Sequence, residues 1–377
     1  MFQILIIDDD RTVQVMLTRM LEKQGYQVLT ASDAEEGMSK AQQFHPALII
    51  CDWMMPQVNG LELCRRIKAD PTLSTTFFIL LTPLGSVAER VKGLDAGADD
   101  FITKPVEQNE LKARVRTGLR LRQLSCDLQT QKQIMETEFI EAVEYVRSLL
   151  PPPMTEPLII NSRFIPSRQL GGDCFDYFWL DPDYLAIYLL DTSGHGLGAA
   201  LPSISVLNLL RSRALKSINY YHPSEVLSAL NDTFQMTYQN NKYFTIWYGV
   251  YNRATRQLIY ASAGHPPAVL LSGEPTTTQV KELVTPGVPI GMFPDAEYVN
   301  GFCSIEQFSN LYIFSDGVYE IHLPNATIWE LAAFIELLKD CRSTRSCNLD
   351  QILNSLVNLS RKAAFDDDLS ILQVKFN

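Results

Sequence analysis

The stretch ILIIDDD, residues 4–10, joins a short run of apolar side chains to three aspartates. Two further apolar runs follow, ALII at 47–50 and FFILL at 77–81. A strand that is apolar throughout is buried on both faces, as in a parallel sheet covered by helices. Between the first two runs, apolar residues from Val13 to Leu21 recur at helical spacing. This alternation predicts a doubly wound α/β domain with a parallel sheet.

Polar residues stand where these strands end. In a doubly wound sheet, functional side chains gather at the carboxyl ends of the strands. The residues expected there are Asp8, Asp9, Asp52, Thr82 and Lys104. Three carboxylates offer the oxygen ligands that Mg²⁺ prefers, and a carboxylate can attack phosphorus to form an aspartyl phosphate. Each residue alone would be explained as a solvated strand end, but together they predict a phosphorylation site.

Residues 1–120 resemble the receiver domain of response regulators. The resemblance rests on ILIIDDD, LIICDWMMPQVNG and ILLTPLGSVAERVKGLDAGADDFITKP, which occur in the family's order and spacing. It implies a five-stranded parallel sheet, one bound Mg²⁺, and phosphorylation of Asp52 by a sensor histidine kinase or a phosphotransfer protein. One departure is Pro83, where the family usually has a small residue. The implied Mg²⁺ ligands are Asp8, Asp9, Asp52 and the Met54 carbonyl, and the implied catalytic and switch residues are Asp52, Thr82, Lys104 and Phe101.

No strand pattern occurs between Val106 and Leu150. Apolar residues instead recur at every seventh position, and a heptad repeat predicts a long helix with a coiled-coil seam. The seam consists of Leu121, Leu128, Met135, Ala142 and Leu149, with polar residues at Gln131 and Lys132. We predict a helical linker over residues 121–152 that pairs two copies into a homodimer. The alternative is a helix that packs on its own domain.

After Pro153, apolar runs follow one another closely and are joined by short turns, which favours an α+β domain of antiparallel sheets flanked by helices. The expected strands are 158–165, 174–179, 184–190, 243–251, 257–263, 267–271 and 310–314, and the expected helices are 197–216, 223–239, 327–340 and 349–361.

Acidic clusters punctuate this second half of the chain. They are Asp173 with Asp176, Asp191, Asp316, and the run 366–368. Neighbouring buried carboxylates repel one another, so a positive charge is expected among them. Carboxylate and backbone oxygens suit Mg²⁺ or Mn²⁺ rather than zinc. Two such ions about 4 Å apart can activate a water molecule for attack on a phosphoester.

Residues 150–377 resemble the PPM family of metal-dependent serine/threonine phosphatases, in its SpoIIE/RsbU-like branch. The matching motifs are LLPPP, LGGDCFDYF, DTSGHGLGAAL, SAGHPPAVLL, TPGVPIGMF, FSDGVYE and DDDLSILQV. The resemblance implies a β-sandwich flanked by helices over residues 153–377, two Mn²⁺ or Mg²⁺ ions, and a phosphorylated anti-sigma-factor antagonist as substrate in partner-switching signalling. The implied ligands are Asp173, Asp191 as the bridge, the Thr192 carbonyl, Asp316 and Asp367, with Asp176 and Asp368 behind them.

Other classes of protein are less consistent with the sequence. Lys and Arg total 32 against 43 Asp and Glu, a net charge of −11, which opposes nucleic-acid binding over a broad basic face. No basic helix-turn-helix pattern follows residue 120. The stretch GGDCF is similar to a nucleotidyl cyclase motif, but Cys174 stands where that motif needs an acid. A non-catalytic adaptor with a phosphatase-like fold is the remaining alternative.

Seven cysteines without C-x-x-C spacing disfavour a zinc site or a disulfide framework and favour reduced thiols in a cytoplasm. No apolar run is long enough to span a bilayer, so no membrane association is expected.

Two histidines and two arginines have no single interpretation. His195 and His265 either order glycine-rich loops through hydrogen bonds, which we favour, or act as general acids. Arg163 and Arg168 could hold a substrate phosphate, but exposed arginines are usually only solvated, and neither is assigned a role.

Overall fold

The computed structural model describes residues 2–83, 87–167, 170–236, 241–274, 277–323, 327–343, 348–360 and 365–376. The chain divides into two compact units, Met1–Glu138 and Phe139–Asn377.

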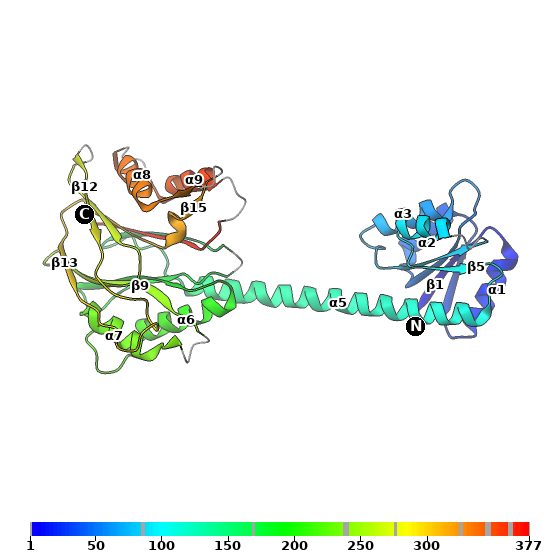
Figure 1. The fold of residues 1–377 in the computed structure, drawn as a ribbon, viewed down its shortest axis with the longest axis horizontal. Helices are drawn as coiled ribbons and strands as arrows, with labels where there is room; N and C mark the ends of the chain where they lie inside the picture. Colours follow the sequence, from blue (N-terminus) through cyan, green and yellow to red (C-terminus); the bar gives the residue numbers. More distant parts are fainter. Residues whose placement is uncertain are drawn as a thin grey trace. The chain divides into compact units, whose positions relative to one another are not determined.

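The first unit is built on a parallel five-stranded sheet in the order β2-β1-β3-β4-β5, which confirms the doubly wound fold (Figure 1). The strands are β1 (Gln3–Ile7), β2 (Gln27–Ala31), β3 (Leu48–Asp52), β4 (Phe77–Thr82) and β5 (Asp100–Thr103). The helices are α1 (Arg11–Glu22), α2 (Ala34–Phe44), α3 (Gly60–Ala69) and α4 (Val87–Asp95). One core packs the sheet against α1 and the start of the long helix that begins at Gln108. The other core packs the sheet against α2 and α3. The edge strands β2 and β5 are only partly buried, which is why no uniformly apolar run marks them.

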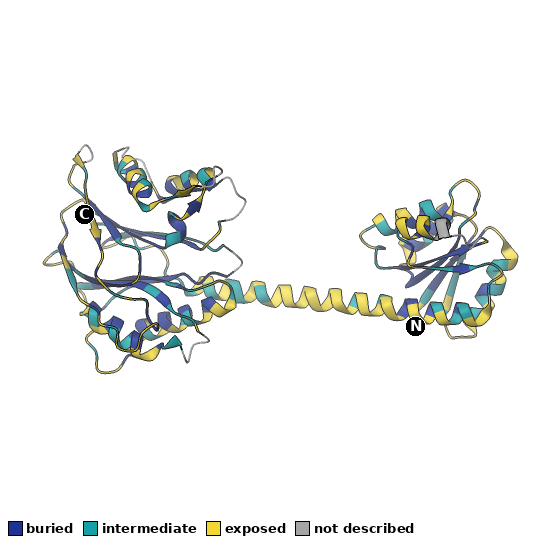
Figure 2. Ribbon diagram, in the orientation of Figure 1, coloured by how far each residue is buried: buried dark blue, intermediate teal, exposed yellow. Residues whose placement is uncertain are grey.

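The helix α5 (Gln108–Leu149) continues for 42 residues without a break at Gln131 or Lys132. Its first turns bury Leu111, Val115 and Leu119 against the parallel sheet. Farther along, the heptad positions from Leu121 to Met135 are exposed and Ala142 and Leu149 are half-buried; Figure 2 shows the exposed middle of the helix. The exposed fractions are 51% for Leu121, 68% for Leu128 and 68% for Met135. An exposed apolar seam is what a paired helix needs, but the pairing itself stays a prediction.

The second unit is a sandwich of two antiparallel five-stranded sheets, in the orders β13-β10-β9-β8-β7 and β12-β11-β14-β17-β6. One core lies between the sheets, a second lies under α6 and α7, and a third lies under α8 and α9. Figure 1 shows the two helix pairs on opposite sides of the sheets. This confirms the predicted α+β sandwich. Its strands are β6 (Ile159–Ile165), β7 (Cys174–Trp179), β8 (Tyr184–Thr192), β9 (Phe244–Asn252), β10 (Gln257–Ala263), β11 (Ala268–Ser272), β12 (Gln279–Leu283), β13 (Gly301–Ser304), β14 (Asn310–Phe314) and β17 (Leu369–Lys375).

The helices of this unit are α6 (Leu197–Arg211), α7 (Pro223–Thr233), α8 (Leu331–Ser343) and α9 (Leu349–Ser360). The first two end earlier than predicted, and α8 begins later because the short strands β15 (Ile321–His322) and β16 (Ile328–Trp329) pair just before it. Five strands were not predicted, namely β12, β13, β15, β16 and β17. Two of them, β12 and β13, are edge strands with exposed side chains, and polar Ser370 and Gln373 interrupt the apolar pattern of β17 although both are buried.

The structure bears on the predictions about thiols and about membrane spans. Cys341 is disulfide-bonded, so the prediction of reduced thiols is wrong at that position. Free thiols occur at Cys51, Cys64, Cys126, Cys174 and Cys303. Among the described residues, no helix combines the length and apolar character that crossing a membrane requires.

Candidate functional site

At the carboxyl end of the parallel sheet, carboxylates surround one ammonium group. Lys104 follows β5, and its Nζ lies 3.0 Å from Asp8 Oδ2 and 2.9 Å from Asp52 Oδ2. Asp8 is completely buried and Asp52 is nearly so. Carboxylate oxygens of Asp8, Asp9 and Asp52 all lie within 4.8 Å of one another. Since oxygen ligands suit Mg²⁺, this trio fits one such ion.

Burial and charge act in opposite directions on this cluster. Burial raises the pKa of Asp8, although a hydrogen bond from the Asp10 N–H and the nearby Lys104 ammonium lower it. Burial alone would lower the pKa of Lys104, but hydrogen bonds to Asp52 and Asp8 outweigh burial and raise it. Lys104 therefore remains an ammonium group between the two carboxylates.

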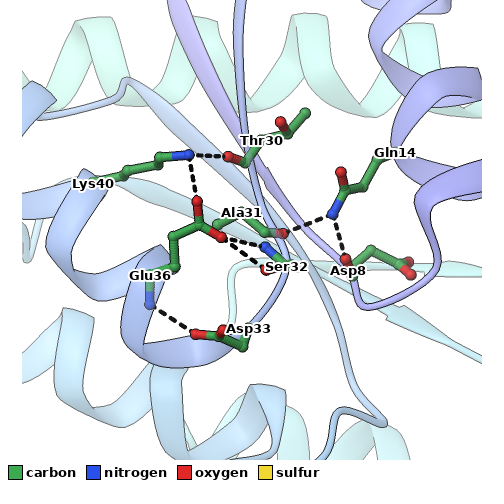
Figure 3. Close-up of polar contacts among 8 residues, drawn as sticks. All are labelled: Asp8, Gln14, Thr30, Ala31, Ser32, Asp33, Glu36 and Lys40. Carbon is green, nitrogen blue, oxygen red and sulfur yellow. Dashed lines mark hydrogen bonds and ion pairs between the residues drawn. The ribbon is translucent and has the colours of Figure 1, made fainter.

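Local hydrogen bonds hold Asp8 in place. The Asp10 N–H donates to Asp8 Oδ1 at 2.9 Å, and Asp10 caps α1 by accepting the Thr12 N–H at 2.7 Å. Gln14 Nε2 donates to the carbonyls of Asp8 at 2.6 Å and Ala31 at 3.1 Å, as Figure 3 shows. Helix α1 thus ties the ends of β1 and β2 together beside the acidic cluster.

The other residues predicted for this site lie around it. The Thr82 carbonyl, at the end of β4, accepts the Lys104 N–H at 2.8 Å. Phe101 in β5 packs where Gly93 leaves room, since a Cβ at Gly93 would lie 2.4 Å from the Phe101 ring. The side chain of Met54 is 65% exposed, and Pro83 is exposed directly after Thr82. Their roles in metal binding and switching remain proposals.

Sequence reasoning missed the glycine that lets α3 approach this site. A Cβ at Gly60 would lie 2.2 Å from the Asp52 carbonyl oxygen, so only glycine permits the approach. The signal was present in the stretch PQVNG, because Asn59 caps α3 by accepting the Glu62 N–H at 2.9 Å.

In the second unit, carboxylates from both sheets converge at one end of the sandwich. Asp173 directly precedes β7 and Asp191 lies near the end of β8, in one sheet. Asp316 follows β14 by two residues and begins the short helix η3 (Asp316–Val318), while Asp367 lies two residues before β17, in the other sheet. Among the described residues, no three of these carboxylates come within 4.8 Å of one another as Asp8, Asp9 and Asp52 do. The cluster is wider than the one in the first unit.

Burial and, after it, mutual repulsion raise the pKa values of the acids in this cluster. Burial raises the pKa of Asp173 well above its usual value, and the charge of Asp191 raises it further. Burial also raises the pKa of Asp191 to about 7, with the charges of Asp316 and Asp367 adding to the shift. Burial and the charge of Asp367 raise the pKa of Asp316 to about 6. These groups are near enough to one another to resist simultaneous ionisation.

Within the described residues, the cluster also lacks cationic partners. Both buried carboxylate oxygens of Asp173 and the Oδ1 of Asp316 have no hydrogen-bond donor. Ser370 and Ser315 lie near enough to lower the pKa of Asp173 slightly, but outside hydrogen-bond geometry. Within the described ranges, no ion pair includes Asp173, Asp191 or Asp316. Because unpartnered buried carboxylates are costly, these residues fit hard divalent cations such as Mg²⁺ or Mn²⁺.

Asp368 organises the loop that holds Asp173. Its carboxylate accepts the Ser167 N–H at 2.8 Å and the Gly172 N–H at 2.5 Å. A Cβ at Gly171 would lie 2.5 Å from Asp368 Oδ2, so glycine is required there. This arrangement supports the predicted position of Asp368 behind the metal ligands.

Asp176 lies elsewhere. Its side chain points to the opposite face of β7 from Asp173, because the two residues are three positions apart. There Asp176 Oδ2 lies 2.7 Å from Arg211 Nε, and Arg211 Nη2 donates to the Leu149 carbonyl at 3.0 Å. Asp176 therefore joins α6 to the end of α5 instead of facing the carboxylate cluster.

A hydrogen bond of its side chain holds Thr192 in place, and its carbonyl lies next to Gly172. The Oγ1 of Thr192 lies 2.8 Å from Ser203 Oγ, and that hydroxyl also contacts the Gly172 carbonyl. A Cβ at Gly172 would lie 2.5 Å from the Thr192 carbonyl oxygen. Ser203, in the interior of α6, is a positioning residue that the sequence motifs did not indicate.

The two histidines occupy different environments. His195 is exposed in the loop after Thr192, and its charge lowers the pKa of Asp367, which burial raises. His265 is buried, its Nδ1 lies 2.9 Å from Thr245 Oγ1, and burial lowers its pKa to about 3. His265 is therefore neutral, which supports a role in ordering its loop.

The two arginines considered for phosphate binding do not provide a free cation in the described structure. Arg163 pairs with Asp350 of α9 at 2.7 Å. Arg168 lies outside the described residues.

Two family models match the chain. The response regulator receiver domain matches residues 4–116, and Stage II sporulation protein E (SpoIIE) matches residues 181–377. Curated relatives include the probable transcriptional regulator ycf27 of Cyanophora paradoxa, 40% identical over 118 residues, which are 31% of this chain and 48% of the relative. The DNA-binding dual master transcriptional regulator RpaA of Synechocystis is 41% identical over 118 residues, 31% of this chain and 49% of the relative. The chain thus spans about half the length of the curated relatives it matches.

Solved structures resemble the second unit in fold. The SiaA-PP2C domain of Pseudomonas aeruginosa has a TM-score of 0.56 and 20% identity, covering 66% of this chain and 99% of that one. The PP2C phosphatase domain with a fragment of the regulatory domain of SpoIIE from Bacillus subtilis has a TM-score of 0.50 and 14% identity, covering 60% of this chain and 64% of that one. At these identities the likeness concerns the fold.

Proposed function

The chain belongs to the SpoIIE family and carries a response-regulator receiver domain, and we propose that it is a response regulator whose output is a metal-dependent protein serine/threonine phosphatase. The observation that supports this most directly is the acidic cluster at the end of the sandwich. Asp173, Asp191 and Asp316 converge there without a cationic partner in the described structure. An adaptor that only held a partner would have no need of such a costly arrangement.

In this proposal Asp173, Asp191, Asp316, Asp367 and the Thr192 carbonyl hold two Mn²⁺ or Mg²⁺ ions, with Asp191 between them. Bound divalent ions would neutralise the cluster, lower the pKa of a water molecule and polarise the phosphoester. The water oxygen would form the new bond to phosphorus as the bond from phosphorus to the seryl or threonyl oxygen breaks, and a proton given up by that water would pass to the leaving oxygen. Asp368 and Ser203 act as positioning residues, because they fix the loops that hold Asp173 and Thr192.

His195 is the better placed of the two histidines for moving a proton. It is exposed and close enough to Asp367 to change its pKa, whereas His265 is buried and bonded to Thr245. Proton donation to the leaving oxygen requires a group that reaches substrate. The role of His195 therefore needs its own test, by comparing esters whose leaving groups differ in pKa.

The input proposed is phosphorylation of Asp52 by a histidine kinase or phosphotransfer protein, with Mg²⁺ held by Asp8, Asp9, Asp52 and the Met54 carbonyl. The Asp52 carboxylate oxygen attacks phosphorus, and the donor nitrogen leaves. Lys104 would then exchange its contact with Asp52 for one with the phosphoryl group, and Thr82 and Phe101 would follow. The proposed substrate of the output domain is a phosphorylated anti-sigma-factor antagonist, and the exposed seam of α5 would pair two copies.

The test uses the full chain with a chromogenic aryl phosphate and with phosphoserine and phosphothreonine peptides. We expect hydrolysis with Mn²⁺ or Mg²⁺ and none with excess chelator. Failure to hydrolyse any of these esters with fresh Mn²⁺ would favour the adaptor.

A further inference from the structure

Lys242 lies beside the loop that follows Asp191 and Thr192. It stands just before β9, and its Nζ donates to the Ser193 carbonyl at 2.6 Å. The backbones of the two segments are also paired, since the Ser193 N–H donates to the Tyr243 carbonyl at 3.0 Å. The ammonium group is therefore held by Ser193, which lies two residues after the proposed bridging residue Asp191.

The loop is shaped to accept this ammonium group. Gly194 has a φ of +88°, and a Cβ there would lie 2.6 Å from Lys242 Nζ. Gly198 also keeps the space open, because a Cβ at that position would approach Lys242 Cε to 4.0 Å. A side chain at 194 would displace the lysine, so these glycines and Lys242 form one arrangement.

In the described structure, the charge of Lys242 and part of its hydrogen-bond donors have no partner. Among the described residues, Lys242 has no ion pair, and its Nζ donates one hydrogen bond, to the neutral Ser193 carbonyl. An ammonium group has three N–H donors, so within the described structure two have no partner. The side chain is half-buried, beside the loop that follows Asp191 and Thr192.

We propose that Lys242 binds the phosphoryl group of the substrate and so determines affinity for phosphate monoesters. This inference rests on the proposed phosphatase function. With the metal ions bound, the cluster would be nearly neutral, and the ammonium group beside the Ser193 loop would attract the phosphoryl dianion of the substrate. Lysine serves well as a point charge for phosphate. Arg163 cannot take this role while it pairs with Asp350.

The experiment compares Lys242→Met and Lys242→Arg in the full chain with Mn²⁺. A matched control is Lys281→Met, since Lys281 is exposed on the edge strand β12. We expect Lys242→Met to raise the KM for a phosphoserine peptide and the inhibition constant of inorganic phosphate about tenfold, as losing one charge-assisted hydrogen bond implies. Lys242→Arg should keep most of the affinity, and Lys281→Met should match the wild type.

Two outcomes would overturn the proposal. One is an unchanged KM and phosphate inhibition constant in Lys242→Met. The other is weaker Mn²⁺ binding and a lower kcat with unchanged phosphate inhibition, which would make Lys242 a positioning residue for the Ser193 loop.

If the wild type hydrolyses no ester, the proposed function fails, and Lys242 is judged separately. Calorimetric titration of inorganic phosphate into the Mn²⁺-loaded protein then decides. Weaker binding to Lys242→Met than to the wild type supports the inference, and equal binding overturns it.

Discussion

The two acidic clusters of this chain solve the same electrostatic problem differently. In the receiver, Lys104 lies within 3.0 Å of both Asp8 and Asp52, so part of the negative charge is balanced inside the protein. In the SpoIIE-family domain, Asp173 has neither a hydrogen-bond donor nor an ion pair in the described structure. The first cluster suits one added cation and a phosphoryl group. The second has no such internal balance, and in the proposed function added cations would supply it, which would separate a site that is modified from a site that hydrolyses.

The largest expected effect is at Asp52. Asp52→Asn should abolish incorporation of phosphate from acetyl phosphate, because the amide that replaces the proposed acceptor carboxylate beside Lys104 does not attack phosphorus. Labelling with Mg²⁺ present, followed by base treatment, measures it, and Asp70→Asn on the surface is the control. Undiminished labelling of the Asp52 variant would place the acceptor elsewhere and remove the distinction between the clusters.

Asp191→Asn should lower phosphatase activity at least about 100-fold, since losing several kcal/mol of charge stabilisation has that consequence. Asp183→Asn is the matched control, because Asp183 is an exposed aspartate that pairs with Arg253. Initial rates over a range of Mn²⁺ concentrations provide the measurement. Wild-type rates from the Asp191 variant at saturating Mn²⁺ would contradict the proposed bridging role.

The metal-free second domain should lose stability as pH rises. Burial and neighbouring charges raise the pKa of Asp191 from 3.8 to about 7, so the folded state binds a proton that the unfolded state has released between these values. The free energy of unfolding therefore falls as pH rises through about 4 to 7, by a few kcal/mol at most.

The measurement is the difference in Tm between Asp191→Asn and the wild type in chelator. We expect this difference to grow by on the order of 5 °C from pH 5 to pH 8 and to shrink when Mn²⁺ is added to the wild type. The low pKa of His265 has the opposite pH effect, but it is common to both proteins. A difference independent of pH would mean that the pKa of Asp191 is not raised in the folded protein.

The smallest effect concerns communication between the clusters. If α5 transmits the state of Asp52 through a paired seam, one residue inserted after Gln131 should change the ratio of phosphatase activity with and without phosphorylation. A seven-residue insertion restores the heptad phase and should preserve the ratio. We expect a change of about threefold, measured with each domain's separate activity as control. Normal regulation in both insertions would make the linker a passive tether.

Much of this architecture follows from local sequence. The apolar runs that include Ile4 and Ile49 predict buried parallel strands, and their ends predict where Asp8 and Asp52 stand, because parallel strands align their carboxyl ends. The repeat through Leu128 predicts a long helix since its period is local. Edge strands such as β12 escape this reasoning, because one face and one edge meet solvent and the side chains need not be apolar.

Tertiary structure alone decides what each acidic residue contacts. Asp173 and Asp176 are neighbours in the sequence, yet the first is unpartnered among carboxylates and the second pairs with Arg211 on the other face of the strand. Lys242 carries no motif, and only the pairing of Tyr243 with Ser193 brings its ammonium group to the loop that follows Asp191 and Thr192. Residue types and spacing determined that this chain has two acidic sites. Which charges are balanced depends on contacts between segments far apart in the chain, because electrostatic interaction falls with distance in space and not with distance in sequence.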